Sequence, residues 1–167
     1  MEKSVNWRAC RKGVLGWFGL LLAGVFLAGC VSVSLPGYIQ DTRPYKKTWS
    51  ASFAAVEKAV LKALNKSGWT IEKQTDPAVY EQDRTASDQD LQQTLLISRV
   101  RPMGFFLGTR YARLNVFIRS ASADKTEVEI RYLTVNSTSV KTFQNYRHDR
   151  AVDRLFTRIA KELQTAP

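Results

Sequence analysis

An alternation of apolar and polar side chains between residues 92 and 135 constrains the fold of this chain more than any other feature. The apolar set of the last two segments occupies every second position: Ala112, Leu114, Val116, Ile118, Val128, Ile130 and Tyr132. A period of two places one set of side chains on each face of a β-sheet. We therefore expect four antiparallel strands, at 69–73, 92–101, 110–120 and 126–135. A further segment at 79–85 is too polar for a central strand.

Two segments with the helical period flank these strands. The first begins at Ser50 or Ser52, either of which can cap a helix, and ends before Gly68. Its apolar face comprises Phe53, Val56, Val60 and Leu64. The second covers about residues 145–164, with an apolar stripe of Val152, Leu155, Phe156, Ile159 and Leu163. The sequence thus predicts an α+β two-layer sandwich, a four-stranded antiparallel meander with both helices on one face.

The first thirty residues have the layout of a bacterial export signal. Its basic residues are Lys3, Arg8, Arg11 and Lys12. An uncharged apolar run at 13–29 follows and ends in the tetrapeptide LAGC, whose last residue is Cys30. This tetrapeptide resembles a lipobox, in which a dedicated peptidase cleaves before a cysteine whose sulfur carries a diacylglyceryl group. The alternative is an uncleaved membrane-spanning helix, which needs roughly 18–20 apolar residues. We favour the lipobox because small residues meet the cysteine where the apolar run stops.

Cleavage before Cys30 would divide the chain into a signal peptide at 1–29, a lipidated tether at 30–47 and an α+β domain at 48–167. Loss of the four basic signal residues and Glu2 lowers the net charge from +10 to +7. The tether contains two prolines and a glycine and would reach at most roughly 55–60 Å if fully extended. By the same resemblance, Val31 after the cysteine suggests sorting to the outer membrane, with the domain facing the periplasm. No pair of cysteines remains for a disulfide.

Sequence motifs for catalysis are absent. His148 is the only histidine, and beside Asp149 at a charged helix start we expect it to be a solvated residue. No second histidine or cysteine follows Cys30 to complete a metal site, and no nucleophile elbow, phosphate loop or dinucleotide fingerprint occurs. Glu127 and Glu129 share the outward face of one strand, as solvated carboxylates often do. We expect no enzyme, no cofactor and no metal.

Basic residues lie beside apolar ones at three places. Residues 101–110 would form an unusually apolar loop between two strands, carrying Arg101, Met103, Phe105, Phe106, Leu107 and Arg110. This loop either caps the core or docks on a partner or bilayer. The last helix carries a basic stripe of Arg147, Arg150, Arg154, Arg158 and Lys161, either a solvated face or an anion-binding surface. A second such surface on the outward sheet face would comprise Arg99, Arg101, Arg113, Arg119 and Arg131, with Tyr111 and Phe117 between them.

The order of elements over about residues 45–165 resembles small bacterial lipoprotein domains of the helix-grip or BamC type. The similarity consists of an aromatic residue before an alanine-rich helix, a Gly-Trp pair before a strand, a meander and a C-terminal helix. It implies a non-enzymatic envelope domain that binds a partner or assists assembly, and it transfers no catalytic residue.

Together these features predict a lipid-anchored envelope lipoprotein that acts as a non-catalytic binding or assembly module at the outer membrane. Its partners would be the membrane through acylated Cys30, an envelope protein and possible anionic lipid, and not nucleic acid, because the chain is exported. The alternative is a carrier of a lipid or other apolar ligand in a cavity between the sheet and the C-terminal helix. A hydrolase would require titratable residues that converge in a cleft.

The lipobox predicts that Cys30→Ser abolishes incorporation of radiolabelled palmitate and leaves the unprocessed precursor, because serine has no sulfur to accept the diacylglyceryl group. Metabolic labelling followed by electrophoresis measures both effects. Equal labelling of the wild type and the variant would end the lipoprotein interpretation.

Overall fold

The computed structural model describes residues 35–81, 92–105, 108–137 and 142–165, and it does not describe the side chains of Phe105 and Gly108. The chain divides into two compact units, Met1–Ser32 and Val33–Pro167, and only the second contains described residues. Cys30 and the expected signal peptide therefore lie outside the described residues. In the described part, neither helix has the length and apolar character needed to cross a membrane.

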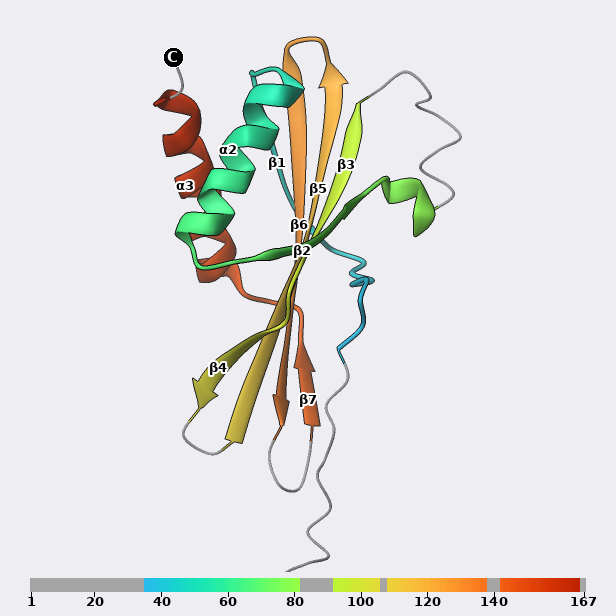
Figure 1. Cartoon of the computed structure of the whole chain (residues 1–167), viewed down its shortest axis with the longest axis vertical. Coiled ribbons are helices and arrows are strands. Elements are labelled where there is room, and N and C mark those ends of the chain that lie inside the picture. Colours follow the sequence, from blue (N-terminus) through green and yellow to red (C-terminus); the bar gives the residue numbers. More distant parts are fainter. Residues whose placement is uncertain (1–34, 82–91, 106–107, 138–141, 166–167) are drawn as a thin grey trace, which may run out of the picture. The chain divides into compact units, whose positions relative to one another are not determined.

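The described residues of the second unit form an α+β structure with a seven-stranded antiparallel sheet and two α-helices (Figure 1). In chain order its elements are β1 (Tyr45–Trp49), α2 (Phe53–Lys66), β2 (Ile71–Thr75), the 3-10 helix η1 (Pro77–Val79), β3 (Gln93–Ser98), β4 (Arg101–Phe105), β5 (Gly108–Ser122), β6 (Lys125–Ser137), β7 (Thr142–Asn145) and α3 (Asp149–Gln164). The main strand order is β1-β6-β5-β3-β2, and β4 and β7 pair with β5 and β6. The fold class is as predicted, but the four-stranded meander is wrong.

The expected strand at 92–101 is divided into β3 and β4, which pair with different parts of β5. Ile97 pairs with Asn115 and Arg101 with Ala112, so one extra residue is inserted on the β3–β4 side. At this bulge Arg99 donates its N–H to the carbonyl of Thr70 at 2.8 Å. An inserted residue reverses the alternation of side chains along a strand. Even-numbered positions of β3 therefore face the helices, whereas odd-numbered positions of β4 do so.

The bulge also changes the interpretation of the apolar loop. Residues 101–105 form β4 and pair with 108–112 of β5, so most of the expected loop is a hairpin. Met103 packs against the main core and is half-buried. Phe106 and Leu107 lie outside the described residues.

Three other expected boundaries differ in the structure. The strand predicted at 69–73 is β2, two residues later, because residues 67–69 complete the end of α2. The weak strand was expected to begin at Val79, but Val79 is the last residue of η1. The carboxylate of Asp76 caps η1 by accepting a hydrogen bond from the N–H of Ala78. The final helix begins at Asp149 rather than 145, because β7 ends at Asn145.

Helix α2 ends in a Schellman motif that the sequence predicts from Gly68. The Gly68 N–H donates to the carbonyl of Asn65 at 2.8 Å, and the Trp69 N–H donates to that of Leu64 at 3.0 Å. Gly68 has a φ of 74°, which L-residues with a Cβ rarely adopt. At the other end Ser52 occupies the N-cap position, but its side chain makes no capping hydrogen bond.

Both helices cover the same face of the sheet, as predicted. The main core combines residues from α2, α3 and the helix-facing side of the strands, all buried: Val56, Ala59, Val60, Ala63, Leu64, Leu96, Ala112, Leu114, Val116, Ile118, Val128, Ile130, Tyr132, Val152, Leu155, Phe156 and Ile159. Burial of a large aliphatic side chain contributes about 1.5–3 kcal/mol, so this layer is the chief source of stability in the unit.

The opposite sheet face is covered by residues 35–41, which we call the N-terminal strap. Ile39 is fully buried and packs with Leu133 and Val135, while Tyr38 packs against Phe117. The Ile39 N–H donates to Oδ1 of Asn115 at 2.6 Å. Residues 35–47, expected to belong to an extended tether, therefore pack into the folded unit as the strap and the beginning of β1.

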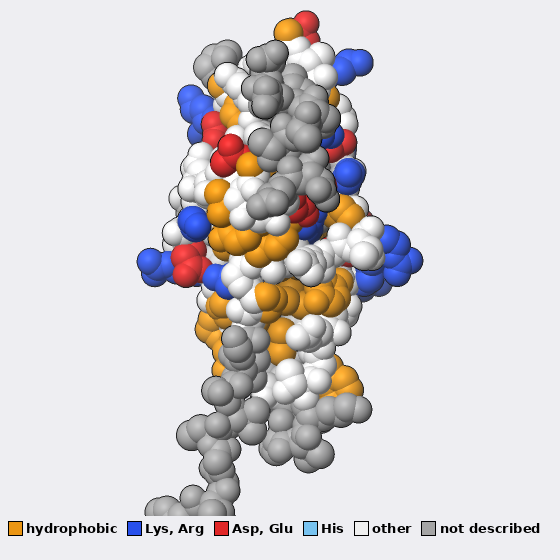
Figure 2. Space-filling model, turned by 90° about the vertical axis from the view of Figure 1, so that its right-hand side faces the viewer, with side chains coloured by type: hydrophobic (Ala, Val, Ile, Leu, Met, Phe, Trp, Pro, Cys, Tyr) orange, Lys and Arg blue, Asp and Glu red, His pale blue; other side chains and the backbone are white. Residues whose placement is uncertain are grey.

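The expected basic surface on this outward face is wrong at its centre, because the arginines there are buried and paired. Arg131 is 4% exposed and forms ion pairs with Glu129 at 2.7 Å and Glu81 at 2.8 Å. Arg113 is also buried and pairs with Glu72. Glu129, expected to be solvated, is 1% exposed. On the side turned away from the helices, apolar side chains gather in the middle with Lys and Arg at the flanks (Figure 2).

Gly68→Ala is expected to lower the free energy of unfolding by about 1–2 kcal/mol, because an L-residue is strained at a left-handed φ. The new Cβ would also lie 3.3 Å from Nη1 of Arg101. Gly104→Ala is the matched control, since a Cβ there meets nothing within 4 Å. Urea unfolding of both variants measures the difference, and equal midpoints would contradict the assignment of strain to Gly68.

Candidate functional site

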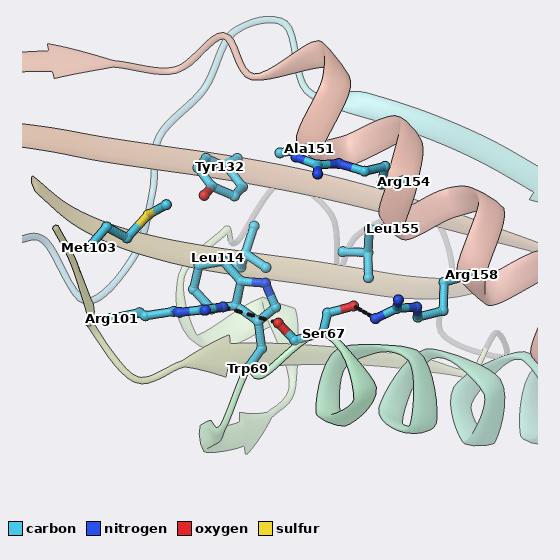
Figure 3. Close-up of a pocket in the computed structure, with 10 residues that line it drawn as sticks. All are labelled: Ser67, Trp69, Arg101, Met103, Leu114, Tyr132, Ala151, Arg154, Leu155 and Arg158. Atoms are coloured by element: carbon cyan, nitrogen blue, oxygen red, sulfur yellow. Dashed lines mark hydrogen bonds between the residues drawn. The ribbon is translucent and has the colours of Figure 1, made fainter. Parts of the chain in front are cut away.

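A cavity of about 330 Å³ lies where the end of α2, the β4–β5–β6 part of the sheet and α3 meet (Figure 3). Its lining residues are Ser67, Trp69, Arg101, Met103, Leu114, Tyr132, Ala151, Arg154, Leu155 and Arg158. Arg154 and Arg158 extend from α3, while Arg101 and Met103 come from β4 (Figure 3). The lining therefore combines apolar side chains with three guanidinium groups.

A second cavity of about 390 Å³ adjoins the first around the start of α3. It is lined by Met103, Arg110, Tyr132, Thr134, His148, Asp149, Arg150, Ala151 and Arg154, four of which also line the first cavity. We call the two cavities together the arginine groove. Five arginines line it: Arg101, Arg110, Arg150, Arg154 and Arg158.

Two of these arginines are held by the end of α2. Arg101 donates from Nη1 to the carbonyl of Ser67 at 3.0 Å, and its guanidinium carbon lies 5.7 Å from the centre of the Trp69 ring. Arg158 donates from Nη1 to the carbonyl of Lys66 at 2.7 Å and to Oγ of Ser67 at 3.0 Å. The last carbonyls of a helix lack intrahelical donors and carry partial negative charge, so they favour nearby cations.

The charges of three groove arginines are not neutralised by ion pairs with other residues that the structure describes. Among the described residues, no carboxylate lies within salt-bridge distance of Arg101, Arg154 or Arg158. Arg154 donates from Nε to the carbonyl of Arg150 at 3.0 Å. The acidic lining residue of the second cavity, Asp149, accepts a hydrogen bond from the Tyr45 hydroxyl at 2.6 Å. The groove therefore has an excess of positive charge.

Tyr132 lies at the junction of the two cavities. Its ring contacts Trp69 edge to face, with centroids 5.7 Å apart and planes at 89°. Burial raises the pKa of the Tyr132 hydroxyl, while the positive charges of Arg101, Arg110 and Arg154 oppose this rise. All three charges are thus close enough to affect the same hydroxyl.

His148 has a structural position rather than the solvated one expected. It is half-buried, its ring lies 4.5 Å from that of Tyr132, and its Nε2 lies 2.9 Å from Oγ1 of Thr134 and 3.2 Å from the Asn145 carbonyl. Thr134 is only 2% exposed, so its hydroxyl is poorly placed to attack a substrate. No cluster of three or more metal-ligating side chains occurs among the described residues.

The fold brings together two predicted sets of residues that lie 40 to 57 positions apart in the chain. Arg101, Met103 and Arg110 of the hairpin face Arg150, Arg154 and Arg158 around α3. Because of the bulge before β4, Arg101 and Met103 lie on the helix-facing side of the sheet. Sequence periodicity alone did not predict this convergence.

Two described residues of the predicted site, Arg147 and Lys161, do not line the groove. Arg147 precedes α3, donates to the Arg43 carbonyl at 2.6 Å and lies 3.9 Å from Asp41. Lys161 is exposed near the other end of α3. The Phe105 side chain, Phe106, Leu107 and Cys30 fall outside what the structure describes. Sequence reasoning missed the other groove residues: Ser67, Trp69, Leu114, Tyr132, Thr134, His148, Asp149, Ala151 and Leu155. Trp69, next to the glycine that ends α2, carried a local signal.

No family model matches this chain, and no curated protein is significantly similar to it. The function is therefore inferred from the residues of the groove. Guanidinium groups stay protonated at neutral pH and donate paired hydrogen bonds to carboxylates and phosphates. Apolar side chains beside them can bind the rest of an amphiphilic ligand.

The environment of His148 predicts that the protein loses stability as the pH falls below about 6.5, the ordinary histidine value. Burial is the largest influence on the pKa of His148 and lowers it. The hydrogen bond with the Asn145 carbonyl opposes this, the charge of Arg110 adds to it and that of Asp149 opposes it, with a net lowering of the pKa. The unfolded chain then binds the proton more readily than the folded one, so acidification favours unfolding.

Melting temperatures measured between pH 7.5 and pH 5 test this expectation, with His148→Gln as the comparison. The variant is expected to show a flatter pH profile, because the chain has one histidine. Glu162, whose pKa the hydrogen bond from Lys66 lowers, acts only at more acidic pH. Parallel profiles for the wild type and the variant would assign the pH dependence to other groups.

Proposed function

We propose that this protein is a lipid-anchored envelope lipoprotein whose folded unit is a non-catalytic binding module. The anchor is acylated Cys30, and the binding surface is the arginine groove. The observation that carries the proposal is the convergence of the hairpin and helix arginines on one apolar cavity. The lipobox and its export signal support a location at the periplasmic side of the outer membrane.

The side chains of the first cavity favour binding over catalysis. Arginine does not exchange protons near neutral pH, and leucine, methionine and tryptophan provide no acid, base or nucleophile. The two hydroxyl groups of the lining are not activated: that of Ser67 donates to the Ala63 carbonyl at 2.7 Å, and burial raises the pKa of that of Tyr132. Arg101 and Arg158 are already held by the end of α2, so their guanidinium groups are ordered before a partner arrives. Preorganised groups lose less conformational entropy on binding, which increases affinity.

A carrier of an apolar ligand is the second candidate, favoured by the position of the cavity between the sheet and α3. Its volume of about 330 Å³ is at the small end of ligand sites, which span roughly 300–1,000 Å³. A carrier of this size would enclose only part of a lipid. A protein partner would instead place one or two side chains in the groove.

Site-specific photocrosslinking in intact cells of the native host can separate these two functions. Arg150→p-benzoylphenylalanine places the crosslinker at an exposed position that lines the second cavity. Lys58→p-benzoylphenylalanine is the control, since Lys58 is exposed on α2 and lines neither cavity. We expect an adduct at position 150 that is not formed at position 58.

The mass of the adduct identifies the kind of partner. An increase of protein size would support the binding or assembly module, and an increase of lipid size would support the carrier. The same adducts at both positions, or none at position 150 in acylated protein of normal abundance, would contradict a binding role for the groove.

A further inference from the structure

The first cavity contains two chemically different parts. Trp69, Leu114 and Leu155 contribute apolar surface, and all three also pack in the main core. Arg101, Arg154 and Arg158 contribute guanidinium groups from two elements, β4 and α3. A ligand that satisfies both parts must have a negative group attached to an apolar one.

The hydrogen bonds within the protein use only part of the donor capacity of these arginines. Each guanidinium has five N–H donors. Arg101 uses Nη1 for Ser67, Arg158 uses Nη1 for Lys66 and Ser67, and Arg154 uses Nε for Arg150. All of these acceptors are neutral, and the three side chains are exposed, so their remaining N–H groups can donate to an anion.

Capping of α2 is the simplest structural role for these arginines, but it does not explain all of them. Arg101 and Arg158 reach the carbonyls of Ser67 and Lys66, whereas Arg154 makes no contact with α2 among its described hydrogen bonds. Arg154 nevertheless lines both cavities. It is also one of the three arginines whose charge affects the buried hydroxyl of Tyr132.

The size of the cavity limits what the ligand inserts. A space of about 330 Å³ accepts a compact group rather than a whole phospholipid. The flexible side chain of Met103 at the boundary between the cavities can adapt to different apolar shapes.

We propose that the arginine groove is a binding site for an amphiphilic anion, a phosphate or carboxylate joined to an apolar chain. The anionic group binds Arg101, Arg154 and Arg158, and the first part of the chain lies against Trp69 and Leu114. This inference rests on the proposed binding function and specifies the chemistry of its ligand. The anion comes either from a membrane lipid or from a soluble molecule, since both present the same group.

Calorimetric titration of the full chain in phosphatidylcholine nanodiscs tests the proposal with three probes. Hexyl phosphate has both parts of the expected ligand, inorganic phosphate has only the anion, and hexanol has only the apolar chain. We expect saturable binding of hexyl phosphate at least about tenfold tighter than that of either other probe, since a charged hydrogen bond alone corresponds to about one tenfold step or more. Empty nanodiscs provide the correction for partitioning into the bilayer.

Arg154→Gln removes the arginine that lines both cavities and is expected to weaken hexyl phosphate binding about tenfold. Lys58→Gln combined with Lys62→Gln removes two exposed charges of α2 and is expected to leave binding unchanged. Ala151→Phe retains every charge but fills space shared by both cavities, so we expect it to abolish hexyl phosphate binding. Circular dichroism shows whether each variant folds. If Arg154→Gln does not fold, the Ala151→Phe variant tests whether the groove binds hexyl phosphate.

Equal affinity for hexyl phosphate and inorganic phosphate would overturn the apolar part of the proposal. Equal affinity for hexyl phosphate and hexanol would overturn the anionic part. Loss of affinity in the lysine control as large as that in Arg154→Gln would show that net charge, and not the groove, governs binding.

Nanodiscs that also contain phosphatidylglycerol identify the source of the anion. Weaker hexyl phosphate binding in these discs than in the phosphatidylcholine discs would assign the site to a lipid headgroup, and unchanged binding would assign it to a soluble amphiphile. If no probe binds but the position 150 crosslink captures a protein, the ligand proposal fails while the binding function stands.

Discussion

The long antiparallel pairing of β5 with β6 is the interaction on which the rest of the unit depends. It extends from Thr109 opposite Ser137 to Ser122 opposite Lys125. Two shorter strands, β3 and β4, pair with β5 along its length, and two others, β1 and β7, pair with β6. The helices cover the part bordered by β1 and β3, as Figure 1 shows. The groove forms where the helices end and the part of the sheet bordered by β4 and β7 begins. Its position therefore follows from the length of β5 and β6, which extend through both parts.

The two faces of this central pair are stabilised by different forces. The helix side is a layer of aliphatic and aromatic side chains, whereas the other side has a buried ion-pair cluster under the N-terminal strap. Arg131 donates to the Tyr38 hydroxyl at 2.6 Å and to the Ile39 carbonyl at 3.1 Å, besides its carboxylate partners. Burial and the hydrogen bond to Glu81 raise the pKa of Tyr38 to about 12. A buried charge is tolerated when its donors are satisfied in this way, and loss of one partner is costly.

Sequence periodicity predicted the elements that have a strong local pattern. Helix α2, the stripe of α3 and the inward set of β5 and β6 follow directly from spacing. The burial of Arg113 and Arg131 was missed because it depends on the strap, whose partners lie more than seventy residues away in the chain. The groove was missed because one extra residue near Val100 reverses the alternation of β4, and an insertion of this kind has no periodic signature. Lipidation, export and partner remain inferences from motifs.

The N-terminal strap changes the distance available between a membrane anchor and the binding surface. An extended segment of seventeen residues would have allowed the unit to move freely above the bilayer, but the structure has the chain packed from Leu35 onward. If Cys30 carries the lipid, only five peptide links separate it from Leu35, a reach of at most about 18 Å. A connection of this length would keep the unit close to the lipid headgroups. The local concentration of membrane components around it would then be far higher than for a freely diffusing protein, so that even weak affinity would give substantial occupancy.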